Sequence, residues 1–412
     1  MITELYYWIF LCIGLALSTV SNIQFRCIAF TLISVAFLVF AIGSLSPEAE
    51  ITRFWQFNSP YRVIIDLLLF SVFFYLAPKR LKHKSYWFAV KFFLVAGPLL
   101  YLSYYKYLPN MLAYIAGNPL DSGIILPLGV SYFVFRLIHY AIESGRENLP
   151  THNYMEFLTY LFFFPIITAG PIERFEHFKR HWQSDSRRDD LVEGSTRVIY
   201  GLIKKFLIVD VLLITLFNNN TADTVVTRVD SIEQYKVWGF LLLTYIKVYL
   251  EFSAYSDIAI GSSRILGFRI MENFNWPIIA TNIADLWRRW HMTLSGWCQA
   301  YIYLPSIGLT RNPYLAAILT FLFVGIWHSG SLNWLFWGLY HGVGICAYIL
   351  WRRLLQKRKW SPPTGLWIRI PSILITNFWM AGSFAFTATY QNGSWTEIFN
   401  AFILLRRYFL MF

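Results

Sequence analysis

Residues 314–340 read YLAAILTFLFVGIWHSGSLNWLFWGLY and contain no Asp, Glu, Lys or Arg. Two apolar runs, Tyr314–His328 and Leu332–Trp351, flank a short break at Ser329-Gly330-Ser331. Each run approaches the roughly 20 residues that a helix needs to cross about 30 Å of hydrocarbon. The stretch therefore predicts two membrane-spanning helices joined by a tight turn.

The whole chain is similarly apolar and poor in charge. Of its 412 residues 57% are hydrophobic, 19% aromatic and only 14% charged, and the mean hydropathy is +0.47. A soluble chain carries about 25% charged residues. The composition excludes a soluble enzyme, a disordered chain and a disulfide-built secreted module. We expect an all-α polytopic membrane protein, a single domain over residues 1–412, with about eleven spans. The other nine are Leu5–Val20, Ile28–Leu45, Val63–Ala77, Trp87–Leu108, Ile124–Ile142, Val198–Phe217, Tyr235–Phe252, Trp367–Phe386 and Ile398–Met411.

The basic residues set the expected orientation. The net charge of +12 comes from short clusters between the apolar runs, near residues 79–84, 174–188 and 352–359. Cytoplasmic loops carry such clusters, so we expect these loops in the cytoplasm, the N-terminus outside and the C-terminus inside. Clusters of this kind do not indicate a nucleic-acid partner. Ala16-Leu17-Ser18 faintly resembles a signal-peptidase site, but Glu4 stands where a basic region belongs, so the first run is expected to remain as a span.

Two stretches do not fit plain spans. Tyr154–Ala169 is apolar, but the loops on both sides of it are predicted to be cytoplasmic, and Pro165 interrupts it. We expect a re-entrant or in-plane segment there. Ser253–Leu304 is too polar for a plain span. Irregular backbone at membrane depth needs protein or a water-filled cavity around it, so a central cavity is the natural inference.

Ionisable residues inside apolar runs are expensive, and each is a functional hypothesis. Arg136, His139 and Glu143 share one helical face, which favours an interhelical ion-pair network that holds the bundle together. Lys247 and Glu251, four residues apart, are expected to neutralise each other. No role can be assigned to Asp66 from the sequence.

The four cysteines, Cys12, Cys27, Cys298 and Cys346, have neither CxxC pairing nor metal-ligand spacing with histidine. We interpret them as small core residues, and we expect neither a metal site nor a tightly bound cofactor.

His328 is the most isolated ionisable residue, because it ends an apolar run with no charge near it. A neutral imidazole there could accept a proton from a hydroxyl nucleophile, although a hydrogen-bonded core histidine is also compatible with the pattern. His341, beside Gly338 and Gly342, is typical of close helix packing.

The run Asp285-Leu-Trp-Arg288-Arg289-Trp-His291 places an acid, two arginines and a histidine within two helical turns. One interpretation is an interfacial anchor with its tryptophans at the headgroup level. The other is a cationic rim that receives the phosphate of an anionic donor. The pattern leaves both open.

Several motifs together resemble the membrane-bound O-acyltransferase family, and most closely its bacterial branch of alginate and peptidoglycan O-acetylation and teichoic-acid D-alanylation proteins. They occur in the family's order over about residues 126–348. The motifs are LPLGVSYF at 126–133, FPIITAGP at 164–171, EFSAYSDIAIG at 251–261, ENFNWP at 272–277, residues 285–295, IWH at 326–328 and GLYHG at 338–342.

The resemblance implies a helical bundle around a tunnel, with His328 as the catalytic residue and His291 as the second family position on the donor side. Asp285, Arg288 and Arg289 would then receive the donor, for which acetyl-CoA is expected. Residues 253–267 resemble the polysaccharide acetylation proteins more than the D-alanylation protein. The implied function is acetyl transfer, in the bacterial cytoplasmic membrane, to a hydroxyl of an extracytoplasmic glycan or partner protein.

Two alternatives remain at this point. One is D-alanyl transfer from a carrier-protein thioester. The other is a transporter of lipid or glycan in which the histidines relay protons.

Overall fold

The computed structural model describes most of the chain. The described residues are 4–20, 22–45, 61–81, 83, 85–108, 129–182, 187–213, 232–361, 363, 365–390 and 395–410. They form two compact units: residues 1–201 with 255–271, and residues 202–254 with 272–412. The long helix α13 (Gln234–Ile265) contributes residues to both. The single domain expected over residues 1–412 stays a prediction.

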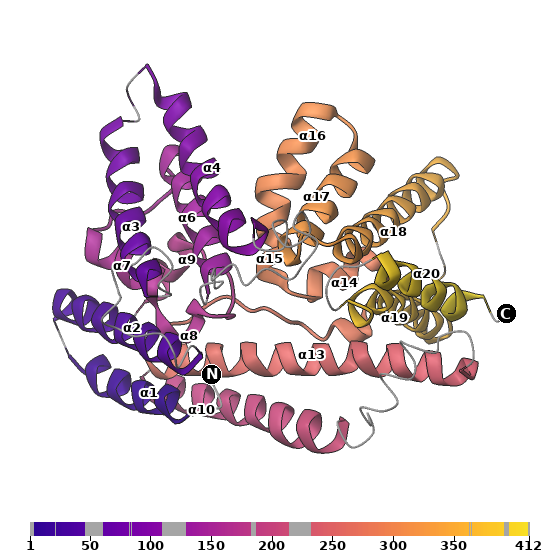
Figure 1. Ribbon diagram of the computed structural model, residues 1–412, viewed down its shortest axis with the longest axis horizontal. Helices are drawn as coiled ribbons and strands as arrows, with labels where there is room; N and C mark the ends of the chain where they lie inside the picture. The colour runs from indigo at the N-terminus through magenta and orange to yellow at the C-terminus, as the bar shows by residue number, and fades with distance from the viewer. Residues whose placement is uncertain are drawn as a thin grey trace. The chain divides into compact units, whose positions relative to one another are not determined.

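The first unit contains the part of α13 from Tyr255 onward and the helices that precede η2 (Ile203–Leu213) in the chain (Figure 1). They are α1 (Leu5–Ser18), α2 (Ile23–Leu45), α3 (Arg62–Leu81), α4 (Trp87–Lys106), α6 (Val130–Gly145), α7 (Tyr154–Phe162), α8 (Phe164–Ile167), α9 (Phe175–Arg180) and α10 (Arg187–Leu202). An isolated β-bridge joins Trp182 to Phe268, and the described residues form no strand.

The second unit contains the rest of α13 and the C-terminal helices. They are the π-helix η2 (Ile203–Leu213), the 3₁₀ turn η3 (Pro277–Ile279), α14 (Ile283–Arg289), α15 (Met292–Cys298), the π-helix η4 (Gln299–Tyr303), α16 (Leu304–Thr310), α17 (Pro313–His328), α18 (Leu332–Lys357), α19 (Leu366–Ala388) and α20 (Trp395–Phe409).

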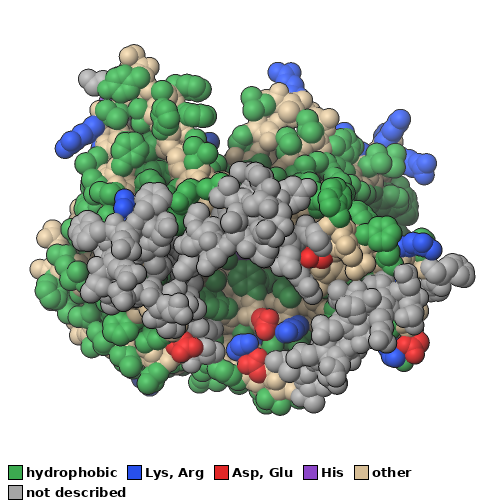
Figure 2. All heavy atoms as spheres, in the orientation of Figure 1, with side chains coloured by type: hydrophobic (Ala, Val, Ile, Leu, Met, Phe, Trp, Pro, Cys, Tyr) green, Lys and Arg blue, Asp and Glu red, His purple; other side chains and the backbone are tan. Residues whose placement is uncertain are grey.

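The chain is an all-α polytopic membrane protein. Among the described residues, five helices are long and apolar enough to cross a membrane, and α1 and α17 are shorter apolar helices. Large apolar side chains are exposed on the spanning helices, as on α4, where Phe88 is 82% exposed. Hydrophobic side chains also cover much of the face drawn in Figure 2, which is what a lipid-facing surface requires. The expected number of eleven spans is not confirmed.

The helix α13 corrects the expected boundary at Phe252. It continues through the Ser-rich stretch to Ile265, and only then does irregular backbone begin. The hydroxyls of Ser253 and Ser263 donate to backbone carbonyls one turn back, so they do not break the helix. Glu251 lies 3.5 Å from the ammonium of Lys205, and its expected pairing with Lys247 is not among the ion pairs of the described residues.

The segment from Tyr154 to Ala169 forms two short helices, as its proline and flanking loops predict. α7 ends at Phe162, α8 begins at Phe164, and Pro165 occupies the first turn of α8. A helix of nine residues rises only about 13 Å, too little to cross the bilayer. Residues 124–128 of the expected span Ile124–Ile142 lie outside the described residues. Gly129 caps α6 at φ 74°, a conformation that favours glycine.

The helices α17 and α18 form a tight antiparallel hairpin, as the opening stretch predicts. A Cβ on Gly325 would overlap the carbonyl oxygen of Trp334, and one on Gly338 would overlap that of Phe321. Small residues let two backbones approach this closely. The hairpin matters for function because His328 is the last residue of α17.

Candidate functional site

Two backbone hydrogen bonds join the residues around His291 to the segment Asn273–Asn275. Asn275 N–H donates to the carbonyl of Arg289 (2.9 Å), and Met292 N–H donates to that of Asn273 (2.8 Å). His291 itself caps α15 with φ 42°, a left-handed conformation rare for a side chain with a Cβ. A residue held in such a conformation is over-determined by its surroundings, which is a feature of functional sites.

His291 is buried, with 3% of its surface exposed. Its Nδ1 lies 2.9 Å from Oδ1 of Asn273, and Phe252 packs edge-on against its ring at 4.7 Å. Its Nε2 is buried and has no hydrogen-bond partner among the described residues. His291 lies outside the five spanning helices, and burial lowers its pKa to about 3, so the imidazole is neutral at physiological pH.

His328 stands in a cage of indole rings. Its imidazole stacks on Trp334 at 4.3 Å with an interplanar angle of 16°, and Trp327 and Trp337 lie at 4.5 and 5.5 Å. Trp337 meets it edge-on, at 76°. These ring contacts hold the imidazole in a fixed orientation at the end of α17.

The turn that follows His328 is anchored to α19 and the residues after it. The hydroxyl of Ser329 lies 3.0 Å from that of Tyr390, and the amide of Asn333 donates to the carbonyl of Phe386 at 3.0 Å. These bonds fix the end of α17 and therefore the position of the imidazole.

Trp327 connects the two predicted histidines. Its ring lies 6.5 Å from that of His291 and 4.5 Å from that of His328. The structure thus brings together two residues that are 37 positions apart in the chain, through the aromatic residue that precedes His328.

His341 packs as its glycine neighbours predict. It is completely buried between Trp287 and Trp337, at 5.0 and 4.5 Å, and Phe321 lies parallel to its ring at 5.9 Å. Neither of its ring nitrogens has a hydrogen-bond partner within the described part of the chain.

The three residues expected to receive the donor differ in their surroundings. Nε of Arg289 lies 3.0 Å from Asp285, and Arg289 also donates to the carbonyl of Asn275. Arg288 is exposed and lines an apolar cavity of about 400 Å³. The walls of that cavity come from α14, α15, η4, α17 and α18. Arg288 therefore has its guanidinium available at a cavity, whereas Asp285 and Arg289 neutralise each other.

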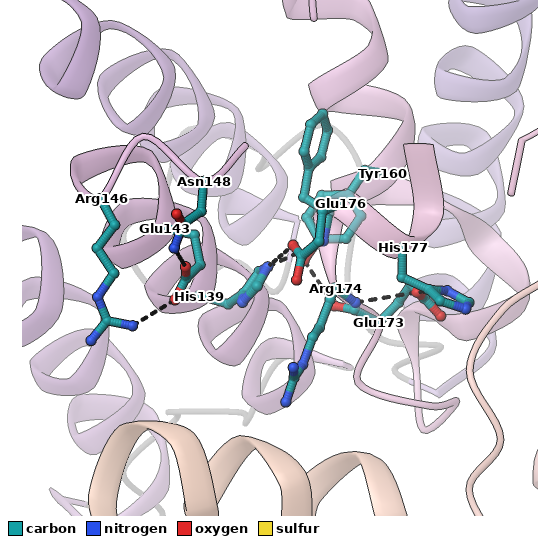
Figure 3. Close-up of polar contacts among 10 residues, drawn as sticks. His139, Glu143, Arg146, Asn148, Tyr160, Glu173, Arg174, Glu176 and His177 are labelled. Carbon is teal, nitrogen blue, oxygen red and sulfur yellow. Dashed lines mark hydrogen bonds and ion pairs between the residues drawn. The ribbon is translucent and has the colours of Figure 1, made fainter. Parts of the chain in front are cut away.

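Arg136, His139 and Glu143 contact different partners in the first unit, and Figure 3 shows those of His139 and Glu143. Arg136 donates to the carbonyl of Tyr160 at 2.9 Å, and His139 lies 2.9 Å from the carboxylate of Glu176. Glu143 accepts hydrogen bonds from Arg146 and Asn148, which follow it closely in the sequence. The contacts of Arg136 and His139 join α6 to α7 and α9, but only His139 pairs with an acidic residue of another helix, so the expected ion-pair network is formed only in part.

The sequence did not single out the neighbouring carboxylate of Glu173. It is completely buried, and it accepts from Nδ1 of His177 (2.6 Å) and from the backbone N–H of Met271 (2.7 Å). Partial burial disfavours the charged form of His177, but the hydrogen bond and charge of Glu173 outweigh that effect and raise the pKa of His177. The spacing of four residues was the available signal, although Glu173 lies just before the start of α9.

Asp66, which could not be interpreted from the sequence, links α3 to α4. Its carboxylate accepts from Tyr101 at 3.1 Å and from Arg62 at 3.4 Å. Among the residues that the structure describes, no group of three His, Cys, Asp or Glu side chains could hold a metal ion.

Comparison with known proteins gives a consistent result. The membrane-bound O-acyltransferase family matches residues 64–391. A probable alginate O-acetylase of Pseudomonas aeruginosa is 36% identical over 231 residues, which is 53% of this chain and 42% of that protein. A teichoic acid D-alanyltransferase of Bacillus subtilis is 30% identical over 60% of this chain and 65% of its own length. A peptidoglycan O-acetyltransferase of Helicobacter pylori is 28% identical over 58% and 50%.

This chain spans less than half of the length of the alginate O-acetylases that it matches. The family match, by contrast, extends over most of the chain, from within α3 to just beyond α19. It includes the segment that carries His291 and the α17–α18 hairpin that carries His328. The chain belongs to the membrane-bound O-acyltransferase family.

Proposed function

We propose that this protein is an O-acyltransferase that moves an acetyl group from a cytoplasmic thioester donor to a hydroxyl group outside the membrane. The observation that carries the proposal is the pair of imidazoles, His291 and His328, which both lie against the ring of Trp327. The printed names of the relatives, which include alginate and peptidoglycan acetylation, support the reaction class.

In the proposed reaction His328 is the general base. Its imidazole takes the proton of the acceptor hydroxyl while the oxygen attacks the thioester carbonyl carbon. The carbon–sulfur bond then breaks, the ester bond is retained, and the departing thiolate receives the proton from His328. A positioned general base contributes about 10²- to 10⁴-fold to such a rate. The surrounding indoles hold the imidazole in one orientation through the two proton transfers.

His291 has a different part in this scheme. Its pKa, lowered to about 3 by burial, makes it a poor proton acceptor at neutral pH. It serves instead as a neutral group that positions a substrate through Nε2. This division assigns proton transfer to His328 and orientation to His291.

The donor is acetyl-CoA, which acts as a substrate and not as a resident cofactor. Its phosphates meet the guanidinium of Arg288, beside the apolar cavity. Asp285 and Arg289 support the rim by bracing α14 through their ion pair. The acyl group passes through a tunnel in the helical bundle toward the acceptor.

The acceptor is a cell-surface polysaccharide, reached directly or through an extracytoplasmic partner protein. The protein resides in the bacterial cytoplasmic membrane, with the N-terminus outside and the C-terminus in the cytoplasm. The basic clusters near residues 79–84, 174–188 and 352–359 support this orientation.

The experiment that tests the proposal uses the purified protein in proteoliposomes and a thioester donor labelled in its acyl group. Acyl transfer releases one free thiol for each ester formed, so both products are measured. A transporter would move label across the bilayer without releasing thiol, and that result would contradict the proposal. Use of a D-alanyl carrier-protein thioester but not acetyl-CoA would reassign the acyl group, in line with the D-alanyltransferase relative.

A further inference from the structure

The amide of Asn273 stands at the centre of the polar contacts around His291. Its Oδ1 lies 2.9 Å from Nδ1 of His291 and accepts from the hydroxyl of Thr293 at 2.8 Å. Both Asn273 and His291 are buried, with exposed fractions of 0% and 3%. No role for Asn273 follows from the family motif or from the relatives' names.

The identity of the accepting atom follows from the third contact. The backbone N–H of Thr293 also points at Oδ1 of Asn273, at 3.5 Å, and a backbone N–H can only donate. The atom between Thr293 and His291 is therefore the amide oxygen and not its nitrogen. An oxygen of this kind can only accept, so Nδ1 of His291 must carry the proton.

The bond from Nδ1 of His291 to Asn273 also determines the state of Nε2, the other ring nitrogen. With the proton on Nδ1, Nε2 of the neutral imidazole carries a lone pair and no hydrogen. Nε2 is buried and has no hydrogen-bond partner in the part of the chain that the structure describes. A buried acceptor without a partner is costly and needs an explanation, and a catalytic role is one of the established explanations.

We propose that Asn273 is a positioning residue, which holds His291 with its proton on Nδ1 so that Nε2 meets the substrate as a hydrogen-bond acceptor. The partner is a substrate O–H or N–H group: the acceptor's hydroxyl, or an amide of the donor's arm. A tetrahedral oxyanion would require a donor in that place, so His291 does not stabilise one in this state. The inference rests on the proposed transfer reaction only for the identity of the substrate.

The surrounding structure is built to keep this geometry. The carbonyl of Asn273 accepts from Met292, so main chain and side chain both connect the residue to the His291 turn. Phe252 and Trp327 flank the imidazole and oppose rotation of the ring. Reversal of the tautomer would leave Oδ1 of Asn273 facing a bare nitrogen.

The first test is a measurement of the tautomer itself, which needs no activity. The full-length protein is labelled with ¹⁵N-histidine, and the resonances of His291 are assigned by their loss in His291→Ala. We expect a protonated Nδ1 and an unprotonated Nε2 in the native protein, and the same in Thr293→Val. A proton on Nε2 of the native protein would overturn the proposal, whatever His291 does in catalysis.

The second test compares two variants at the same oxygen. Asn273→Leu removes the acceptor for His291 at similar volume, whereas Thr293→Val removes only the hydroxyl bond. We expect Asn273→Leu to lower kcat about 10²-fold or more, because a catalytic imidazole that loses its orienting partner adopts the wrong tautomer. Thr293→Val should stay within about fivefold of native activity, since one neutral hydrogen bond is worth roughly 1 kcal/mol. Equal losses in the two variants would contradict the positioning role.

The KM values distinguish the two sources of the substrate hydrogen. A rise in donor KM in Asn273→Leu assigns the bond to the donor's amide, and a rise in acceptor KM assigns it to the hydroxyl. Native transfer by His291→Ala would remove His291 from the proposed mechanism, and the tautomer measurement would still decide the role of Asn273. If Asn273→Leu does not fold, the measurement on the native protein remains decisive.

Discussion

The crossing of α17 and α18 should not tolerate a single methyl group at Gly325. A Cβ there would stand 3.1 Å from the carbonyl carbon of Trp334 and would overlap the attached oxygen. Carbon atoms in contact prefer about 3.5–4.0 Å, so the two backbones must separate by on the order of 1 Å. Gly325→Ala therefore tests the close approach of α17 to the backbone of Trp334, the residue that stacks on His328.

The expected loss of stability in Gly325→Ala can be compared with that of the control substitution Gly239→Ala. Overpacking of this kind costs about 1–3 kcal/mol, and a clash with backbone belongs at the upper end. Gly239 lies in α13 with no atom within 4 Å of its missing Cβ. There the same substitution should be neutral or stabilising by about 0.5–1 kcal/mol, because alanine favours the helix.

Thermal unfolding in detergent measures the difference. Gly325→Ala should lower the unfolding temperature by roughly 2–4 °C, and Gly239→Ala should leave it unchanged or raise it. Acyl transfer by folded Gly325→Ala should also fall, because a moved Trp334 no longer stacks on His328. An unfolding temperature of Gly325→Ala at or above the native value would refute the packing argument.

Three further predictions concern the donor, pH and topology. Arg288→Ala should raise the donor KM about 10- to 100-fold, because it removes a hydrogen bond to a charged group. Arg289→Ala should mainly lower stability, because Arg289 pairs with Asp285. An unchanged donor KM in folded Arg288→Ala would contradict the assignment of Arg288 to the donor site. Because Glu173 raises the pKa of His177 above its ordinary 6.5, the stabilisation by their ion pair is complete below about pH 6.5 and is lost as pH rises through the raised value. His177→Gln should therefore lower the unfolding temperature at about pH 6 and match the native protein at about pH 9; an equal difference at both would argue against the charged pair. In a cysteine-free background, Ser85→Cys should resist an impermeant thiol reagent in intact cells, and labelling would reverse the assigned orientation.

Hydropathy predicted the class of fold because bilayer thickness imposes a length on apolar helices. The α17–α18 hairpin follows from residues 314–340 alone, including the turn at Ser329. The end of α13 could not be predicted from polarity, because the hydroxyl of Ser263 bonds within the helix to the carbonyl of Ala259. A serine that satisfies itself in this way does not signal a break.

The candidate site was predictable in part. The positions of His291 and His328 stand out as histidines in apolar or aromatic surroundings, but their shared contact with Trp327 depends on packing between distant segments. The bond from His291 to Asn273 spans 18 residues with no periodic signal. By contrast, the pairing of Asp285 with Arg289 could have been expected from their spacing of four residues.

The central claim is that His328 takes the proton of the acceptor hydroxyl, and His328→Gln tests it most directly. Glutamine keeps much of the size and hydrogen bonding of histidine but cannot take up a proton. In the labelled-donor assay, His328→Gln should lose about 10²- to 10⁴-fold in transfer rate, as should His328→Ala. The packing control His341→Gln should keep substantial activity. Near-native transfer by His328→Gln in stably folded protein would contradict the account.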